Sequence, residues 1–357
     1  MKRFKIFLII FLAVILSAVQ VNAEAGGGRT SANFLLLGVG AKAIGTGNAM
    51  TADDNDLFAV KYNPASLADN MNTKIGFSYS AYFENIGHHY LGYQRKNLGV
   101  SLQYLDYGKF NRTTYSGFNQ IQGNFSAQDI CAAVSYGYKF QDILDAGISL
   151  KYIKSKLAEF SANAMALDLG MQKEFLLFNE NIRTGISILN LGSKLKYVSK
   201  DENLPLTYRL GLGYSILENI NFNLDFVKQQ YNEFGMQSGI EWKYKNTLAI
   251  RMGYDGLNEA SKKITMGFGV KYSHLEFDYV FVPYNDLDSL HNLTVQYGFG
   301  KAEKKQGIIS SPVSRKAENA SISIYCINCG TYLKPYLEKY VLHFCPECGE
   351  KIYKLEK

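Results

Sequence analysis

The feature that most constrains the fold is a period-two alternation of residue types between about Lys74 and Gly300. In TYRLGLGYSI (207–216), every second residue is Tyr, Leu or Ile, and the residues between them are Thr, Arg, Gly or Ser. The stretches NFNLDFVK (221–228) and LAIRMGYD (248–255) repeat the pattern. Such alternation is typical of β-strands whose two faces meet different surroundings. Fourteen segments of this kind begin near Ile75, His89, Leu98, Gln128, Ala146, Ala162, Asn181, Leu206, Ile220, Met236, Thr247, Lys263, His274 and His291.

The lengths of the connections indicate what kind of sheet these strands form. Links after even-numbered segments are mostly tight, such as KN at 96–97 and at 245–246, whereas 107–128 and 192–205 are long and polar. Short turns at one rim and long loops at the other are typical of outer-membrane barrels. A tilted strand of about ten residues spans a bilayer. We therefore predict an all-β fold, a 14-stranded antiparallel transmembrane β-barrel over residues 74–300 with both ends at the periplasmic, short-turn rim. A soluble β-sandwich is the alternative.

The second face of each predicted strand is small and polar, rich in Gly and Ser with scattered Lys and Arg, as expected for a lumen. Three arginines fall on it, Arg183, Arg209 and Arg251, which either line a ligand path or pair with acidic residues such as Asp168, Glu241 or Asp255. The net charge of +6 is spread along the chain without a dense basic patch, which argues against a nucleic-acid partner.

The first 23 residues have the layout of a signal peptide for export. A basic start is followed by an apolar run from Phe7 to Val19 and by the small-residue exit Val21-Asn22-Ala23. A retained membrane anchor is the alternative, although the apolar run is short for a full span.

Residues 33–72 do not alternate, and their apolar spacing predicts one or two short helices. The glycines Gly38, Gly40 and Gly45 match no phosphate-binding motif. The acidic cluster 53–56 lacks the spacing of a Ca²⁺ loop, so we expect it to be solvated or to cap a helix. Pro64 favours an extended Asn63, and Asn63-Pro64-Ala65 is therefore predicted to turn the chain into the first strand.

The stretch GVGAKAIGTGNAMTADDNDLFAVKYNPASLAD (38–69) resembles the N-terminal region of the PorV/PorQ family, within the FadL-like long-chain fatty acid transporters. The resemblance extends over roughly residues 33–300. It implies a hatch segment, residues 24–73, inside a fourteen-stranded barrel, with Asn63, Pro64 and Ala65 as its hatch element. It also implies a location in the cell outer membrane, in contact with its lipid.

Three functions are consistent with the resemblance. The first is passage of hydrophobic small molecules across the outer membrane, with apolar hatch surfaces such as Phe34, Leu35 and Leu36 meeting the ligand, although the sequence does not identify the ligand-binding residues. The second is a PorV-type role in type IX secretion, in which long external loops such as 110–125 bind exported proteins. The third is a barrel that anchors a periplasmic zinc module.

The zinc prediction concerns the C-terminal tail, residues 322–357, which follows a charged, small-residue linker at 301–321. Its cysteines form the pattern C-x₂-C-x₁₅-C-x₂-C, which is a strong signal for a structural, four-coordinate zinc ribbon. The four expected ligands are Cys326, Cys329, Cys345 and Cys348. We expect the tail in the periplasm with a possible partner there, and because that compartment oxidises thiols, two disulfides or an iron or redox site are the alternatives.

The sequence carries no motif of an enzyme. It has no nucleophile elbow and no H-E-x-x-H element, so we predict no catalytic residues. His88-His89 is interpreted as an exposed pair at a loop edge, and Cys131 as an inert side chain on the lumen face.

Overall fold

The structure is a computed structural model that describes nine stretches of the chain: residues 30–53, 56–68, 72–113, 121–141, 143–177, 180–197, 201–217, 219–232 and 234–299. The chain divides into two compact units, Met1–Lys301 and Ala302–Lys357. The predicted signal peptide, linker and cysteine tail all lie outside the described residues. Within those residues, no helix has the length and apolar character needed to cross a membrane.

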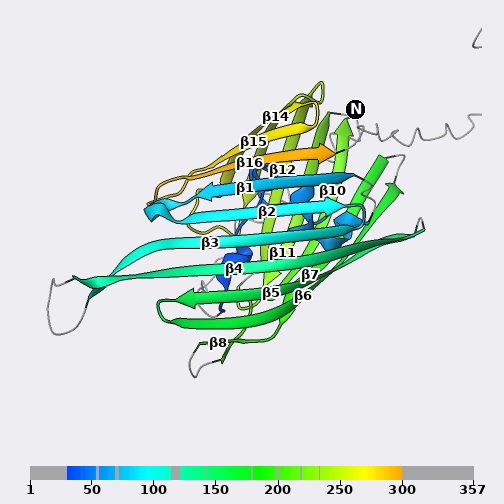
Figure 1. The fold of residues 1–357 in the computed structure, drawn as a ribbon. Helices are drawn as coiled ribbons and strands as arrows, with labels where there is room; N and C mark the ends of the chain where they lie inside the picture. The colour runs from blue at the N-terminus through cyan, green and yellow to red at the C-terminus, as the bar shows by residue number, and fades with distance from the viewer. Residues whose placement is uncertain are drawn as a thin grey trace, which may run out of the picture. The chain divides into compact units, whose positions relative to one another are not determined.

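Fourteen antiparallel strands form a closed barrel (Figure 1). They are β1 (Thr73–Ala81), β2 (Gly87–Arg95), β3 (Leu98–Thr113), β4 (Ile121–Phe140), β5 (Leu144–Leu157), β6 (Phe160–Leu177), β7 (Glu180–Gly192), β10 (Thr207–Leu217), β11 (Ile220–Gln229), β12 (Phe234–Tyr244), β13 (Leu248–Asp255), β14 (Ile264–Tyr272), β15 (Leu275–Val282) and β16 (Leu290–Phe299). Each strand pairs with its neighbour in sequence, and β1 closes the barrel on β16 with Thr73 opposite Phe299. Two short strands, β8 (Leu195–Lys196) and β9 (Asp201–Glu202), form a separate ladder in the link between β7 and β10.

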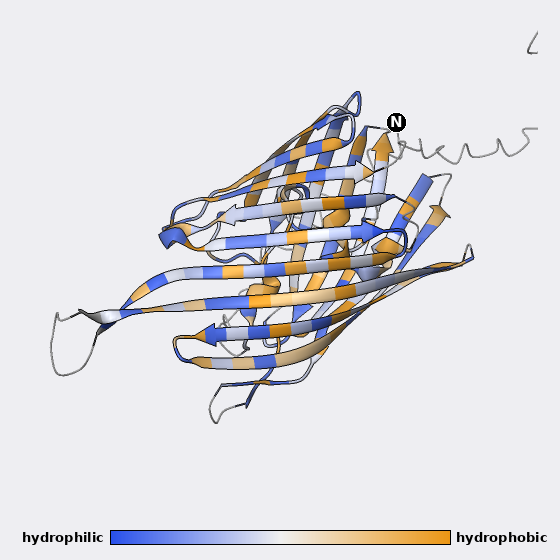
Figure 2. Ribbon diagram, viewed as in Figure 1, coloured by the Kyte–Doolittle hydropathy of each residue, from blue (hydrophilic) through white to orange (hydrophobic). Residues whose placement is uncertain are grey.

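The predicted faces are confirmed. Leu210 and Met252 point outward with 46% and 55% of their surface exposed, whereas their neighbours Arg209 and Arg251 point inward and are buried. Figure 2 shows this alternation of apolar and polar residues along the strands. Nearly every strand exposes apolar side chains on the outside of the barrel. Contact with lipid hydrocarbon removes this apolar surface from water, so the outer face suits a membrane.

The turns confirm the two different rims. The turn between β12 and β13 has positive φ at both Lys245 (48°) and Asn246 (54°), as a two-residue hairpin turn requires. Lys96 and Ser273 also have positive φ in the turns after β2 and β14. We call this end of the barrel, which also holds Thr73 and Phe299, the short-turn rim, and the opposite end the long-loop rim.

One predicted loop is wrong. The sequence predicts a long loop over residues 107–128, but β3 continues to Thr113 and β4 begins at Ile121. The hairpin therefore extends further than its neighbours β1 and β2 (Figure 1). The ladder has register shifts after Asp106 and after Asn111. Each irregularity interrupts the period of two, and the alternation therefore does not reveal this part of the strands. The other thirteen predicted starts lie within two residues of the observed ones.

The N-terminal segment, residues 30–68, consists of short helical pieces separated by irregular chain. These are η1 (Asn33–Leu36), α2 (Ala41–Gly45), η2 (Leu57–Lys61) and η3 (Pro64–Leu67), and a further turn, η4 (Phe83–Asn85), links β1 to β2. The pieces lie against inward faces on different sides of the barrel, η3 on β4 to β6 and α2 on β13 to β16. In Figure 1 the segment is drawn in blue between strands in front of it and strands behind it.

Candidate functional site

Glycines on the inward faces of the strands make room for the N-terminal segment. A Cβ atom at Gly147 would lie 2.2 Å from the carbonyl carbon of Pro64, and one at Gly185 would lie 2.1 Å from the carbonyl oxygen of Thr51. Several of these glycines are paired across neighbouring strands: Gly76 with Gly92, Gly137 with Gly147, Gly147 with Gly170, Gly185 with Gly211, and Gly239 with Gly253. At Gly137, Gly147, Gly185, Gly239 and Gly253 a larger residue would displace the segment, because backbone atoms of the segment lie in the way. At Gly76 and Gly92 the nearest atoms of the segment belong to side chains.

Arg209 fastens the segment to β10 and β11. Its Nε donates to Thr51 Oγ1 at 2.8 Å, and its Nη2 donates to the Asn48 carbonyl at 2.7 Å and to Asp225 Oδ2 at 2.8 Å. The same Asp225 oxygen accepts the backbone N–H groups of Met50 (3.1 Å) and Thr51 (3.0 Å). Arg209 therefore pairs with Asp225, which is not one of the predicted acidic partners, and the pair is structural.

Other buried charges are also paired. Arg251 lies 2.7 Å from Glu241 and 2.5 Å from Asp278, so the predicted pairing with Glu241 is confirmed. Asp168 pairs with Lys151 at 2.5 Å rather than with an arginine. These contacts favour the interpretation that the charges hold the barrel interior together rather than form a ligand path.

The acidic cluster of the segment is partly as predicted. Asp56 caps η2, since its carboxylate accepts the N–H of Phe58 at 2.7 Å. Asp53 is not solvated, because it is buried and bonded to Lys42 at 2.8 Å. The charge of Asp53 raises the pKa of the Lys42 ammonium above its usual range against the opposing effect of burial, so the pair is ionised.

Asn63-Pro64-Ala65 has a different place from the one predicted. Asn63 is extended, as Pro64 requires, but it caps η3 through its Oδ1, which accepts the N–H of Ala65 at 3.0 Å. Its Nδ2 donates to the carbonyls of Thr51 (2.8 Å) and Met171 (3.0 Å), which joins the segment to β6. The element is therefore a clamp inside the barrel, and the first strand starts only at Thr73.

The predicted exposure of His88 is wrong, since the side chain is buried in β2 with its Nε2 3.0 Å from Gln103 Nε2. Gln103 in turn donates to the Phe34 carbonyl at 2.8 Å, and Lys61 Nζ donates to the Leu35 carbonyl at 2.8 Å. These bonds fix η1. The alternation of β2 could have predicted that His88 is buried, because His88 falls on the same face as the inward-facing Tyr90.

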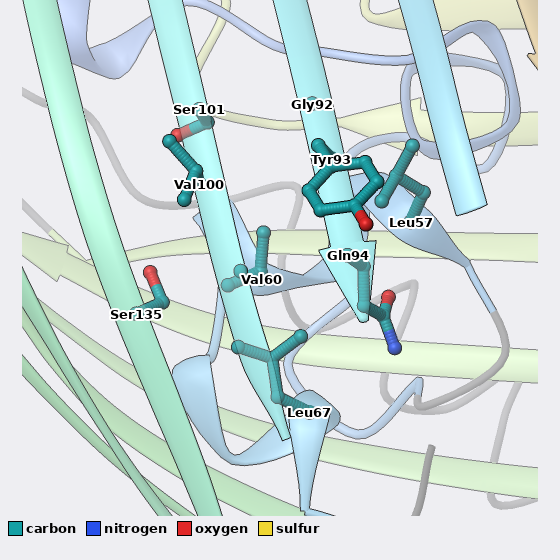
Figure 3. Close-up of a pocket in the computed structure, with 10 residues that line it drawn as sticks. Leu57, Val60, Leu67, Gly92, Tyr93, Gln94, Val100, Ser101 and Ser135 are labelled. Carbon is teal, nitrogen blue, oxygen red and sulfur yellow. The ribbon is translucent and has the colours of Figure 1, made fainter. Parts of the chain in front are cut away.

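Packing between η2, η3 and strands β2 to β4 is nearly complete. Figure 3 shows Leu57, Val60 and Leu67 of the segment beside small strand residues such as Ser101 and Ser135. The space that remains there measures about 10 Å³, room for about one water molecule.

A much larger cavity, of about 520 Å³, lies at the long-loop rim. We call it the mouth cavity. Its floor is the N-terminal segment, with Phe34, Leu36 and Ile44, and its walls come from the links at this rim, with Tyr82, Leu257 and Tyr284. Of the three predicted apolar surface residues, Phe34 and Leu36 line the cavity, whereas Leu35 packs in a buried cluster with Leu105 and Ile153 and does not line it.

The structure does not place the predicted zinc ligands, which lie outside the described residues. Among the residues that are described, no group of three or more His, Cys, Asp or Glu side chains is arranged to hold a metal ion. Cys131 is buried, as expected for its inward-facing position on β4.

The fold is shared with known outer-membrane barrels. The toluene transporter TodX of Pseudomonas putida is 15% identical, with 73% of this chain and 98% of that chain covered and a TM-score of 0.50. A FadL homologue of Pseudomonas aeruginosa is 10% identical, with 74% and 99% covered and a TM-score of 0.48. A search of curated proteins found no significant match.

The family comparison agrees with the barrel and with its N-terminal segment. The family described as type IX secretion system protein PorV matches residues 21–241, which include the segment and the strands from β1 to β11. The match covers more than half of the chain. This outer-membrane barrel belongs to the PorV family.

Proposed function

We propose that the barrel takes an apolar small molecule into the mouth cavity and lets it pass through the lumen when the N-terminal segment moves as a hatch. The observation that carries the proposal is the floor of the cavity, which is the segment itself. A volume of about 520 Å³ lies within the range of small-molecule sites, which are mostly apolar clefts of about 300–1,000 Å³. The toluene transport of the similar Pseudomonas putida barrel supports this proposal.

Opening the floor requires few bonds to break. Residues 33–37 are held to β3 by the bond from Gln103 to the Phe34 carbonyl and to η2 of the same segment by the bond from Lys61 to the Leu35 carbonyl. The preceding Ser31 N–H donates to the Asn203 carbonyl at 2.9 Å. Each such bond contributes about 0.5–1.5 kcal/mol net. Because η1 is only four residues long, its movement does not require a long helix to unwind. The free energy of ligand binding at the floor therefore has to offset only the loss of these local contacts.

A reversible lock tests the hatch. In the variant Ser31→Cys/Asn203→Cys, the two positions are joined by a backbone hydrogen bond, and such pairs come close enough for a disulfide. We expect oxidation to lower uptake of toluene by intact cells that carry the protein in their outer membrane, and reduction to restore it, with each single-cysteine variant as a matched control. Equal uptake in the oxidised and reduced states would refute the moving floor.

A second function is favoured by the family. The PorV match suggests that the chain serves type IX secretion and binds exported proteins at the cell surface. The extended β3–β4 hairpin offers a surface for this, since Phe110 is exposed and its ring stacks on that of Phe125 at 5.4 Å between centroids. If this function holds, Phe110→Ser/Phe125→Ser lowers co-purification of exported proteins and their display at the cell surface, while filling the mouth cavity does not.

A third, compatible function concerns the tail. We propose that the barrel anchors a periplasmic zinc module held by Cys326, Cys329, Cys345 and Cys348. All three proposals are non-enzymatic, and they differ in which part of the chain meets the partner.

A further inference from the structure

The chemistry of the mouth cavity indicates which small molecules it selects. Its lining contains two carboxylates, Asp255 and Glu259, and no lysine or arginine among the described residues. Seven side-chain carboxamides also line it, including Gln229, Gln230 and Asn258. The remaining wall is largely apolar. A ligand inside therefore meets apolar surface, neutral hydrogen-bonding groups and negative charge only.

Two buried cations near lining residues are paired with carboxylates. A third cation, Lys228, is not in the lining, but its Nζ donates to the carbonyl of the lining residue Asn232 at 2.5 Å. Arg209 donates to Gln237 Oε1 at 2.8 Å, but its charge is paired with Asp225 at 2.8 Å on the side of the segment. Lys42 is paired with Asp53 at 2.8 Å. These pairs are buried and hydrogen-bonded, and breaking one to bind a ligand would leave its acidic partner uncompensated.

Asp255 is held in one orientation on the cavity wall. Its Oδ2 accepts from Asn48 Nδ2 at 2.9 Å, and its Oδ1 accepts from Gln237 Nε2 at 2.8 Å and from the Leu257 N–H at 3.1 Å. Glu259 lies on the link that follows β13 and is exposed at the opening. A carboxylate head group that enters past Glu259 towards Asp255 loses water and approaches like charge on the way.

We propose that the mouth cavity selects apolar ligands whose polar end is neutral or cationic, and that it rejects alkyl carboxylates. The inference rests on the proposed uptake function and specifies its substrate class. A neutral hydroxyl or an ammonium group donates hydrogen bonds to carboxamide and carboxylate oxygens. The carboxamide N–H groups would also donate to a carboxylate head group, so the rejection comes from the like charges of Asp255 and Glu259. A fatty acid, whose chain fits the same apolar wall, is excluded by its head group.

Three ligands with the same ten-carbon chain test the head group. Equilibrium binding of decan-1-ol, decylamine and decanoate is measured at pH 7.5 on the full-length protein in a non-ionic detergent, with the same micelle concentration throughout. We expect decanol and decylamine to bind at least tenfold more tightly than decanoate. The variant Glu259→Lys should strengthen decanoate binding and weaken decylamine binding several-fold. Leu287→Lys is the matched control, since Leu287 lies exposed in a link at the same rim but outside the cavity lining.

Filling the cavity separates specific binding from partition into micelles. Leu36→Trp on the floor and Ala260→Trp on the wall should each remove the binding that wild-type protein shows. If decanoate binds as tightly as decanol and both are lost in the tryptophan variants, the head-group inference is overturned and uptake stands. The inference also fails if Glu259→Lys acts no differently from Leu287→Lys. If the tryptophan variants change no binding at all, the cavity takes none of these molecules, and both the inference and the uptake function are refuted.

Discussion

The contact between Gly147 and η3 offers a precise way to loosen the N-terminal segment without changing the barrel wall. In the variant Gly147→Ala, the new Cβ would lie 2.2 Å from the carbonyl carbon of Pro64, 2.3 Å from the nitrogen of Ala65 and 2.4 Å from the Pro64 oxygen. All three are backbone atoms, so no side-chain rotation relieves the contact. Since ordinary contacts are near 3.5 Å, η3 has to move by about 1 Å or more.

The strain falls on η3 because the strand is held more firmly. Gly147 pairs with Gly137 on one side and with Gly170 on the other, within continuous ladders. Overpacking of this kind costs about 1–3 kcal/mol. At about 1.4 kcal/mol for each factor of ten, η3 should open about 5- to 150-fold more often.

Hydrogen exchange read by mass spectrometry measures this opening. We expect peptides over residues 64–68 to exchange faster by that factor in Gly147→Ala, while peptides from β14 keep their wild-type rate. The matched control is Gly298→Ala in β16, where the nearest atom to the new Cβ is the His274 oxygen at 4.0 Å. Unchanged exchange at 64–68 would refute the close-contact reasoning, and equal acceleration of β14 would show that the substitution loosens the barrel as a whole rather than η3.

Three further predictions concern charges and the tail. Arg209→Met leaves Asp225 buried without a cation and should cost about 3–5 kcal/mol, measured by thermal unfolding in detergent, whereas Arg112→Met at the exposed pair with Glu159 should leave the unfolding temperature unchanged. Burial lowers the pKa of Lys61 from 10.5 to about 7, with the charge of Lys151 acting in the same direction. Between these two values the unfolded chain holds a proton that the folded chain lacks, so stability should rise from pH 7 towards pH 10, and Lys61→Met should flatten that rise; an identical slope in both proteins would contradict it. The full-length protein should carry one zinc ion per chain by elemental analysis, lost in Cys326→Ser/Cys345→Ser and kept in Cys131→Ser, whereas zinc-free protein with oxidised cysteines would support the disulfide alternative.

The sequence by itself determined the strands and their faces. In a barrel wall each residue meets either lipid or lumen, and the alternation of Leu210 with Arg209 and Gly211 records that choice directly. The turns follow for a similar reason, since two residues such as Lys245 and Asn246 leave only a tight hairpin between two strands. The number of strands and the division into two rims are consequences of these local patterns.

Only the tertiary structure decided how the inside of the barrel is filled. The close approach of Pro64 to Gly147 and the pairing of Arg209 with Asp225 join residues from different parts of the chain. No local sequence pattern predicts such contacts, and the acidic partners suggested for Arg209 therefore did not include Asp225. The extension of β3 and β4 was hidden for another reason, because the register shifts after Asp106 and Asn111 break the period that marks a strand.

The mouth cavity depends on tertiary structure most of all. Its floor residue Leu36 and its wall residue Leu257 are far apart in the sequence, and they share a cavity only after the barrel closes around the segment. The local sequence predicts which face of a strand a side chain lies on, because successive side chains point to opposite faces. It does not predict which links meet across the closed rim, because that depends on the pairing of all the strands between them.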